Sequence, residues 1–204
     1  MTKIAIINYQ AGNLRSVQKA LEKVGANVQV TSEPDEILSS DGVVFPGQGA
    51  CDSSMKNLRK KQLDMIITDV IKQGKPFLGV CLGMQLLLEN SEEGNENCLG
   101  ILGGKVRELP NSMKKPHMGW NQVKILRDNL LFKNIPQHSF FYFVHSFYSD
   151  PNQNEVVSGI TDYGIEFCSA LSFGNVNAVQ FHPEKSGLTG LKIYENFLRY
   201  FVKG

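Results

Sequence analysis

Cys81 occupies a position typical of a catalytic nucleophile. It lies between an apolar run at 75–80 and a helix-forming run at 82–90, with Gly79 and Gly83 two residues away on either side. A sharp turn from strand to helix requires small residues there, because the backbone is strained and packs closely. The N-terminus of a following helix favours a thiolate, which is the reactive form of cysteine. The alternative is a buried, unreactive thiol, and this is our interpretation of the other three cysteines, which lack such a setting: Cys51, Cys98 and Cys168.

His182 is the strongest candidate for a general base. It follows the apolar run 177–181, and Pro183 restricts the backbone so that the chain turns at the strand end. Sites in α/β proteins lie at the carboxyl ends of strands. Glu184 could accept a hydrogen bond from the imidazole and hold one tautomer. Taken alone, the pair would be better explained as a hydrated loop histidine beside a surface glutamate.

The other histidines lack this setting. His145 lies within an aromatic run and is expected in the core or in a substrate-lining position. His117 and His138 are expected in loops.

Residues 46–49, Pro-Gly-Gln-Gly, follow a short apolar run and supply candidate oxyanion donors. Glycine lets backbone N–H groups approach a ligand closely. With the N–H of Leu82, those of Gln48 or Gly49 could form an oxyanion hole, in which one donor is typically worth about 3–4 kcal/mol in the transition state. An ordinary tight turn is the alternative.

The elements that must position these residues alternate between strand and helix in the first half. Short apolar runs predict strands at 3–8, 27–31, 42–45 and 75–80, and helical spacing predicts helices at 14–24, 53–73 and 82–90. This alternation favours βαβ units with a parallel sheet.

The second half differs in pattern. Closely spaced strands are predicted at 139–144, 155–160, 165–173 and 177–181, as an antiparallel set packed against the parallel sheet. A closing amphipathic helix is predicted from 188 to 201. Because the chain contains no repeat or Pro/Ser-rich linker, we expect one domain over residues 1–204.

Composition excludes several other classes of protein. The 204 residues include 21 Lys+Arg and 20 Asp+Glu, a net charge of +1 that argues against nucleic-acid binding. No apolar run reaches the roughly 18 residues that span a bilayer, and the N-terminus does not resemble a signal peptide. We therefore expect a cytoplasmic protein without membrane contact, whose cysteines are reduced thiols. No CxxC or other metal-ligand spacing is present, so no metal site is expected.

Five motifs in order resemble those of the class I, triad-type glutamine amidotransferases. They are PGQG, GVCLGMQLL, HMGWN, YFVHSFY and QFHPEKS. HMGWN and FVHS narrow the resemblance to the glutaminase subunits of the imidazole glycerol phosphate synthases of histidine biosynthesis. The resemblance extends from residue 11 to the terminal helix and implies an α/β fold: a flavodoxin-like, mostly parallel sheet flanked by helices, with an additional antiparallel set of strands.

The resemblance also implies roles for individual residues. Cys81 would be the nucleophile, His182 the general base and acid, and Glu184 the residue that orients His182. The oxyanion donors would be Leu82 with Gln48 or Gly49. Four residues would bind glutamine: Gln85, Glu93, Ser146 and Phe147. Five match positions near a partner interface: Asn13, His117, Trp120, Asn121 and Lys185.

The reaction implied is hydrolysis of glutamine through a γ-glutamyl thioester, with no metal or organic cofactor. Ammonia would pass to a (β/α)₈ synthase in a heterodimer. The synthase would convert a phosphoribulosyl aminoimidazole carboxamide (PRFAR) to imidazole glycerol phosphate and an aminoimidazole carboxamide ribotide (AICAR). In this family the PGxG strand is thought to switch orientation between idle and active states.

Two departures from the family pattern leave the identity of the partner synthase open. Residues 8–13 read Asn-Tyr-Gln-Ala-Gly-Asn where the family reads closer to Asp-Tyr-Gly-x-Gly-Asn, and Gln48 replaces the usual valine. One alternative is a glutaminase that serves a related barrel synthase, which forms amidino groups on surface-polysaccharide sugars. Two others are a stand-alone hydrolase of γ-glutamyl peptides and a scaffold protein without catalytic activity.

Overall fold

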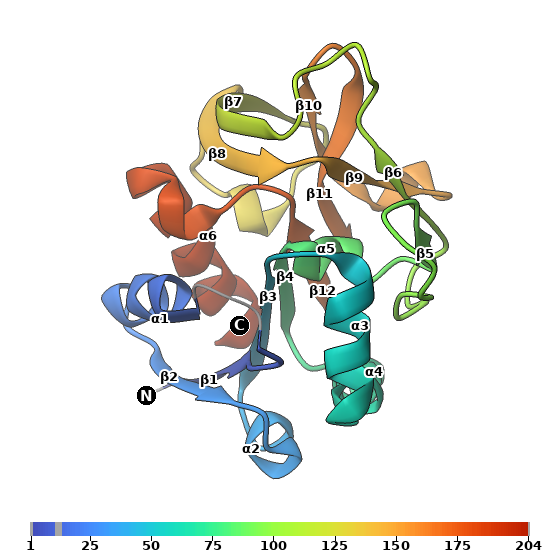
Figure 1. Ribbon diagram of the computed structural model, residues 1–204. Coiled ribbons are helices and arrows are strands. Elements are labelled where there is room, and N and C mark those ends of the chain that lie inside the picture. Colours follow the sequence, from blue (N-terminus) through green and yellow to red (C-terminus); the bar gives the residue numbers. More distant parts are fainter. Residues whose placement is uncertain (1, 11–13, 204) are drawn as a thin grey trace.

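Five parallel strands form the centre of the molecule. The computed structural model describes residues 2–10 and 14–203. The strands are adjacent and parallel in the order β2-β1-β3-β4-β12 (Figure 1), which is the flavodoxin-like order. Their bounds are β1 (Lys3–Ile7), β2 (Asn27–Thr31), β3 (Gly42–Gly47), β4 (Phe77–Cys81) and β12 (Val176–Val179). The predicted flavodoxin-like parallel sheet is confirmed.

The antiparallel strands continue this sheet instead of packing against it as a separate layer. The strand predicted at 177–181 is not one of them, because β12 pairs parallel with β4. Because the turn at Gly174 folds the chain back on itself, β11 pairs antiparallel with the free edge of β12. The sheet then runs through β10 and β7 to β8, while β9 pairs with β11 and β6, and β6 pairs with β5. The bounds are β5 (Asn90–Ser91), β6 (Gly104–Glu108), β7 (His117–Ile125), β8 (Ser139–His145), β9 (Phe147–Pro151), β10 (Val157–Asp162) and β11 (Glu166–Phe173).

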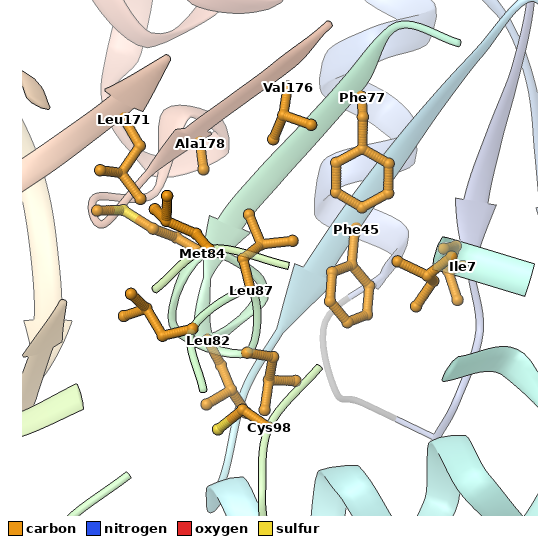
Figure 2. Packing of buried hydrophobic residues seen from close by; sticks show 14 of the residues in the cluster. Ile7, Phe45, Phe77, Leu82, Met84, Leu87, Cys98, Leu171, Val176 and Ala178 are labelled. Carbon is orange, nitrogen blue, oxygen red and sulfur yellow. The ribbon is translucent and has the colours of Figure 1, made fainter. Parts of the chain in front are cut away.

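Helices cover both faces of the parallel strands. The helices are α1 (Leu14–Lys23), α2 (Pro34–Leu38), α3 (Cys51–Lys60), α4 (Leu63–Lys72), α5 (Leu82–Gln85) and α6 (Gly187–Phe197). Ile4 and Ile6 of β1 pack in a cluster with side chains of α1 and α6, whereas Ala5 and Ile7 pack in a second cluster with those of α2, α3 and α4. Figure 2 shows part of the second cluster, including Phe45. Strands buried on both faces are apolar at every position, which explains the continuous run in β1.

Two predicted helices differ from the structure. The helix expected at 53–73 is broken at Gln62, which has φ +57°. Leu58 and Leu63 are both fully buried, yet residues five apart on one continuous helix point about 140° away from each other. The break lets α3 and α4 each turn its own apolar face inward.

The helix expected at 82–90 ends at Gln85. The next carbonyl groups bond to a distant loop: that of Leu86 accepts from Leu99 N–H, and that of Leu88 accepts from Gly100 N–H, at 2.9 and 2.8 Å. The leucines stay buried, but their backbone is held by a segment about a dozen residues further along the chain. Within residues 2–10 and 14–203, no helix is both long and apolar enough to cross a bilayer.

Candidate active site

Cys81 lies at a strained elbow between β4 and α5. Its backbone has φ +56° and ψ −113°, a conformation that is costly for a residue with a Cβ atom and that persists only where the surroundings enforce it. The elbow packs directly on β3, since a Cβ atom at Gly83 would lie 1.8 Å from the Phe45 carbonyl oxygen. The predicted sharp turn with flanking glycine is confirmed.

Strand register places the candidate nucleophile between the oxyanion segment and the candidate base. Gly47 of β3 lies opposite Cys81, and Val179 of β12 lies opposite Val80 on the other side of β4. His182 follows Val179 by three residues. Because parallel strands end at one edge of the sheet, this register brings three separate segments together there.

His182 and Glu184 form a buried hydrogen-bonded pair. The Nδ1–Oε1 distance is 2.8 Å, and each side chain is only 2% exposed. Tyr194 of α6 donates its hydroxyl to the second oxygen of Glu184 at 3.3 Å. The backbone is held as well, because Ser186 donates its hydroxyl to the His182 carbonyl at 2.7 Å. The alternative of a hydrated histidine beside a surface glutamate is therefore wrong.

The electrostatic surroundings favour the protonated form of His182. Burial lowers its pKa, but the negative charge of Cys81 and the hydrogen-bonded Glu184 carboxylate outweigh burial and raise the pKa to about 10. Because Nδ1 is bonded to Glu184, the ring interacts with the Cys81 sulfur through Nε2, and this contact is among the causes that raise the pKa. The arrangement suits a protonated imidazole beside the sulfur of Cys81.

One cavity of about 430 Å³ unites the predicted site residues, and its volume falls in the range of small-molecule sites, roughly 300–1,000 Å³. Its walls include the predicted nucleophile, base, oxyanion segment and glutamine-binding residues: Cys81, His182, Gln48, Gly49, Leu82, Gln85, Glu93, Ser146 and Phe147. Lys185 and His145 also line it, the latter as expected for a substrate-lining position. Within the described ranges, no cluster of three or more His, Cys, Asp or Glu side chains is placed to hold a metal ion.

Gln180 joins the candidate nucleophile to Gln85, a role that the sequence did not predict. Its side chain donates to the Cys81 sulfur at 3.7 Å and accepts from Gln85 Nε2 at 2.9 Å. Gln85 also donates to the Phe147 carbonyl at 2.7 Å. Gln180 is fully buried. A polar residue near the end of the otherwise apolar run 177–181 was the only signal for it in the sequence.

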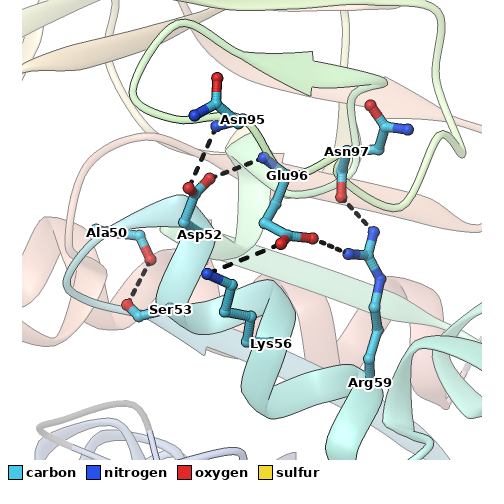
Figure 3. A network of polar contacts seen from close by, with 8 residues as sticks. All are labelled: Ala50, Asp52, Ser53, Lys56, Arg59, Asn95, Glu96 and Asn97. Atoms are coloured by element: carbon cyan, nitrogen blue, oxygen red, sulfur yellow. Dashed lines mark hydrogen bonds and ion pairs between the residues drawn. The ribbon is translucent and has the colours of Figure 1, made fainter.

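Glu93 is held at the cavity wall by a polar network. Its carboxylate accepts the backbone N–H of Cys51 at 2.7 Å, and burial raises its pKa. Asp52 accepts the N–H groups of Asn95 and Glu96 at 3.2 and 3.0 Å (Figure 3). Arg59 contacts the Glu96 carboxylate and donates to the Asn97 carbonyl. The loop that carries Glu93 is thereby fastened to α3.

Of the predicted interface residues within the described ranges, three lie on β7 and Lys185 follows β12 at the cavity wall. Trp120 is 55% exposed, and Lys185 lies 5.6 Å above the ring of Tyr142. His117 lies in β7 and is buried. The loop predicted for His117 is wrong, because β7 pairs with β8 over this whole stretch. Asn13 lies outside the described residues.

Comparisons with known proteins agree with this geometry. The family model "Glutamine amidotransferase class-I" matches residues 5–200. A Moorella thermoacetica protein, imidazole glycerol phosphate synthase subunit HisH, is 50% identical over 198 residues, covering 97% of this chain and 94% of the relative. HisH 1 of Methanococcus maripaludis is 52% identical over 199 residues, covering 96% and 98%.

Solved structures support the fold at lower identity. A chain of PurLQS from Thermotoga maritima matches with a TM-score of 0.78 and 18% identity, covering 98% of both chains. A glutamine amidotransferase from the same organism matches with a TM-score of 0.75 and 17% identity, covering 100% of this chain and 99% of its own.

Proposed function

Because this chain belongs to the class I glutamine amidotransferases, among the HisH subunits of imidazole glycerol phosphate synthase, we propose that Cys81, His182 and Glu184 hydrolyse the side-chain amide of glutamine. The observation that carries this proposal is the strained Cys81 elbow sharing one cavity with His182, whose Nδ1 is bonded to Glu184. This is the geometry of a nucleophile, its acid–base partner and the residue that orients that partner.

The Cys81 thiolate attacks the amide carbon and forms a tetrahedral oxyanion. As the C–N bond breaks, the His182 imidazolium gives its Nε2 proton to the leaving nitrogen, which departs as ammonia. A γ-glutamyl thioester remains on Cys81. His182, now neutral, takes a proton from water, and the hydroxide released attacks the thioester to yield glutamate and the thiolate. Glu184 stabilises the charged imidazole throughout and keeps Nε2 toward the substrate.

Backbone N–H groups stabilise the oxyanion. The first N–H groups of a helix have no intrahelical acceptor, so the N–H of Leu82 at the start of α5 can serve this role. Gly47 lies opposite Cys81, and Gln48 and Gly49 follow it along the cavity wall. Gly49 has φ +92°, so this segment reaches the site through a conformation that glycine adopts without strain.

The remaining cavity residues hold the substrate. Glu93 pairs with the α-ammonium group, and the backbone at Ser146 and Phe147 binds the α-carboxylate. The side chain of Gln85 donates a hydrogen bond to the Phe147 carbonyl and holds it in place. The cavity thus offers a carboxylate for the positive group of the amino acid and backbone atoms for its negative group.

The ammonia serves a partner synthase with a (β/α)₈ barrel, which uses PRFAR and releases imidazole glycerol phosphate and AICAR. Free ammonia would be protonated and diluted in bulk water, so the reaction favours direct transfer. The exposed Trp120, with Met118 and Phe140 nearby on β7 and β8, offers an apolar face beside the cavity against which the partner docks.

Transfer of the ¹⁵N label from the side-chain amide of glutamine tests the whole assignment. The protein is mixed with the barrel synthase of the same source and PRFAR, and imidazole glycerol phosphate is analysed for the label. Labelled product is expected. Glutamate without labelled product would retain the glutaminase and move the acceptor elsewhere, for example to a sugar-amidinating barrel enzyme. Absence of glutamate would refute the proposed hydrolysis.

A further inference from the structure

Two buried histidines connect the surface of β7 to the glutamine cavity. His145 Nδ1 lies 2.9 Å from the Phe147 carbonyl oxygen, and His145 Nε2 lies 3.0 Å from His117 Nδ1. His117 Nε2 lies 3.3 Å from the side-chain nitrogen of Asn121. His117 is 4% exposed and His145 is 6% exposed. The contacts form one continuous line from Asn121 to a carbonyl of the cavity wall.

The amide of Asn121 can adopt only one orientation. Its Oδ1 accepts the backbone N–H of Gln122 at 2.7 Å, and its Nδ2 donates to the Asp162 carbonyl at 2.8 Å. A backbone N–H only donates and a carbonyl only accepts, so exchanging the two amide atoms would break both bonds. Asn121 therefore presents a donor to His117 Nε2.

The Asn121 donor determines which ring nitrogen carries the proton in His117 and in His145. His117 Nε2 must accept, so its proton is on Nδ1 and is donated to His145 Nε2. His145 Nε2 then accepts, and its own proton is on Nδ1, directed at the Phe147 carbonyl. Burial keeps both rings neutral, lowering the pKa of His117 to about 4 and that of His145 to about 3. A neutral imidazole has one donor and one acceptor, so the line has no alternative arrangement that satisfies all its members.

We propose that Asn121 and the His117–His145 pair are positioning residues that fix the Phe147 carbonyl for glutamine binding. The Phe147 oxygen accepts from His145 on one side and from Gln85 on the other, so both of its lone pairs are used. The Phe147–Tyr148 peptide, to which this carbonyl belongs, is thereby held in one orientation, and with it the backbone of Phe147 at the cavity wall. The His117 ring also stacks on the rings of Tyr163 and Phe143, with distances between ring centroids of 4.0 and 5.0 Å. This inference rests on the proposed role of the Ser146–Phe147 segment.

Nitrogen-15 NMR of the histidine rings tests the line without reference to activity. In the wild-type chain, His117 and His145 are expected to be neutral with the proton on Nδ1. Replacing Asn121 by leucine removes the donor, so the Nδ1–H fraction of His145 should fall. Gln122→Leu, on the exposed face of the same strand, is the matched control and should leave the tautomers unchanged. Nδ1–H tautomers that persist in full in Asn121→Leu, or Nε2–H tautomers in the wild-type chain, would overturn the inference.

Kinetics of two His145 variants test the consequence for substrate. His145→Leu removes the donor to Phe147, whereas His145→Asn retains an N–H near the position of Nδ1. The KM for glutamine should rise on the order of tenfold in the leucine variant with a smaller change in kcat, and recover in the asparagine variant. An unchanged KM in His145→Leu refutes the positioning role.

The carbonyl ¹³C shift of Phe147 separates failure of this inference from failure of the proposed function. It should move in His145→Leu and return toward the wild-type value in His145→Asn. If the wild-type chain releases no glutamate, the proposed function fails, and the tautomers and the Phe147 shift still decide whether the line exists. A Phe147 shift that is the same in all three proteins would overturn the line itself.

Discussion

His182 and Glu184 are separated by one residue, Pro183, yet their side chains meet at 2.8 Å in a nearly dry interior. The 3₁₀ turn Pro183–Lys185 curls the chain back so that the carboxylate lies under the imidazole. Because Glu184 also accepts from Tyr194 of α6, the terminal helix helps to hold the candidate acid–base residue His182.

Glu184→Gln should lower kcat/KM for glutamine by about 10²–10⁴-fold. The amide keeps the shape of the side chain but removes the charge that stabilises the imidazolium. Steady-state glutaminase assays measure the loss. Tyr194→Phe is the matched control: it removes one neutral contact to Oε2 and leaves the Oε1 bond to His182, so its effect should stay below about tenfold. Equal losses in the two variants would contradict a specific role of the charge.

The alkaline limb of the pH profile of glutaminase activity should reflect the loss of the His182 proton. Its pKa is raised to about 10, and the mechanism requires its proton, so kcat/KM should fall as the pH rises through about 10. Removing the negative charge in Glu184→Gln should move this limb to lower pH. A limb that stays in place in the variant would assign it to another group.

The raised pKa of His182 also predicts how the stability of the folded protein depends on pH. The unfolded histidine has a pKa of about 6.5, so the folded state binds the proton more tightly. The stabilisation from the charged imidazole is therefore complete below about pH 6.5 and is lost as the pH rises through about 10. The difference in thermal stability between wild type and Glu184→Gln should narrow from pH 7 to pH 10, as differential scanning calorimetry would show.

Cys81→Gly should be more stable than Cys81→Ala by about 1 kcal/mol. Both variants lack the sulfur, but only glycine adopts φ +56°, ψ −113° without strain. Chemical denaturation of the two proteins gives the comparison. If alanine proved the more stable of the two, the elbow would not be strained.

Much of this site could be predicted from local sequence. The Gly79-x-Cys81-x-Gly83 spacing is enough to indicate the elbow, since the constraint involves neighbouring residues. Gln180 was missed because its partner Gln85 is 95 residues away. The short α5 was missed for the same reason: the carbonyls that end it are taken by residues 99–102. Likewise, His117 becomes a strand residue only through its pairing with His145.

Gly83→Ala should abolish the native fold of the nucleophile region and destabilise the protein by more than about 3 kcal/mol. A Cβ atom there would lie 1.8 Å from the backbone oxygen of Phe45, which belongs to a buried central strand and cannot yield. Gly25→Ala is the control: Gly25 has φ +93°, which Gly83 does not, but a Cβ atom there would meet nothing within 4 Å in the described part of the chain. It should cost only about 1 kcal/mol. Thermal unfolding of both variants measures the difference, and similar values would show that the elbow does not depend on contact with β3.

Asp52→Ala should raise the KM for glutamine several-fold while leaving kcat nearly unchanged. Asp52 does not line the cavity, but its carboxylate holds the N–H groups of Asn95 and Glu96, which are separated from Glu93 only by Gly94. Without that anchor the loop loses two charge-assisted hydrogen bonds to backbone N–H groups. Glu93 then meets the α-ammonium group of the substrate in a wider range of positions, which weakens binding in the ground and transition states alike.

Lys56→Ala provides the matched control for Asp52→Ala. Lys56 comes from the same helix and contacts the same loop, but its ion pair with Glu96 is 3.9 Å long and its side chain is 66% exposed, so its loss should leave KM within about twofold. Steady-state kinetics of the two variants decide between the alternatives. A fall in kcat without a change in KM in Asp52→Ala would mean that the loop acts on the chemistry at Cys81, and that Glu93 does not bind the substrate through this anchor.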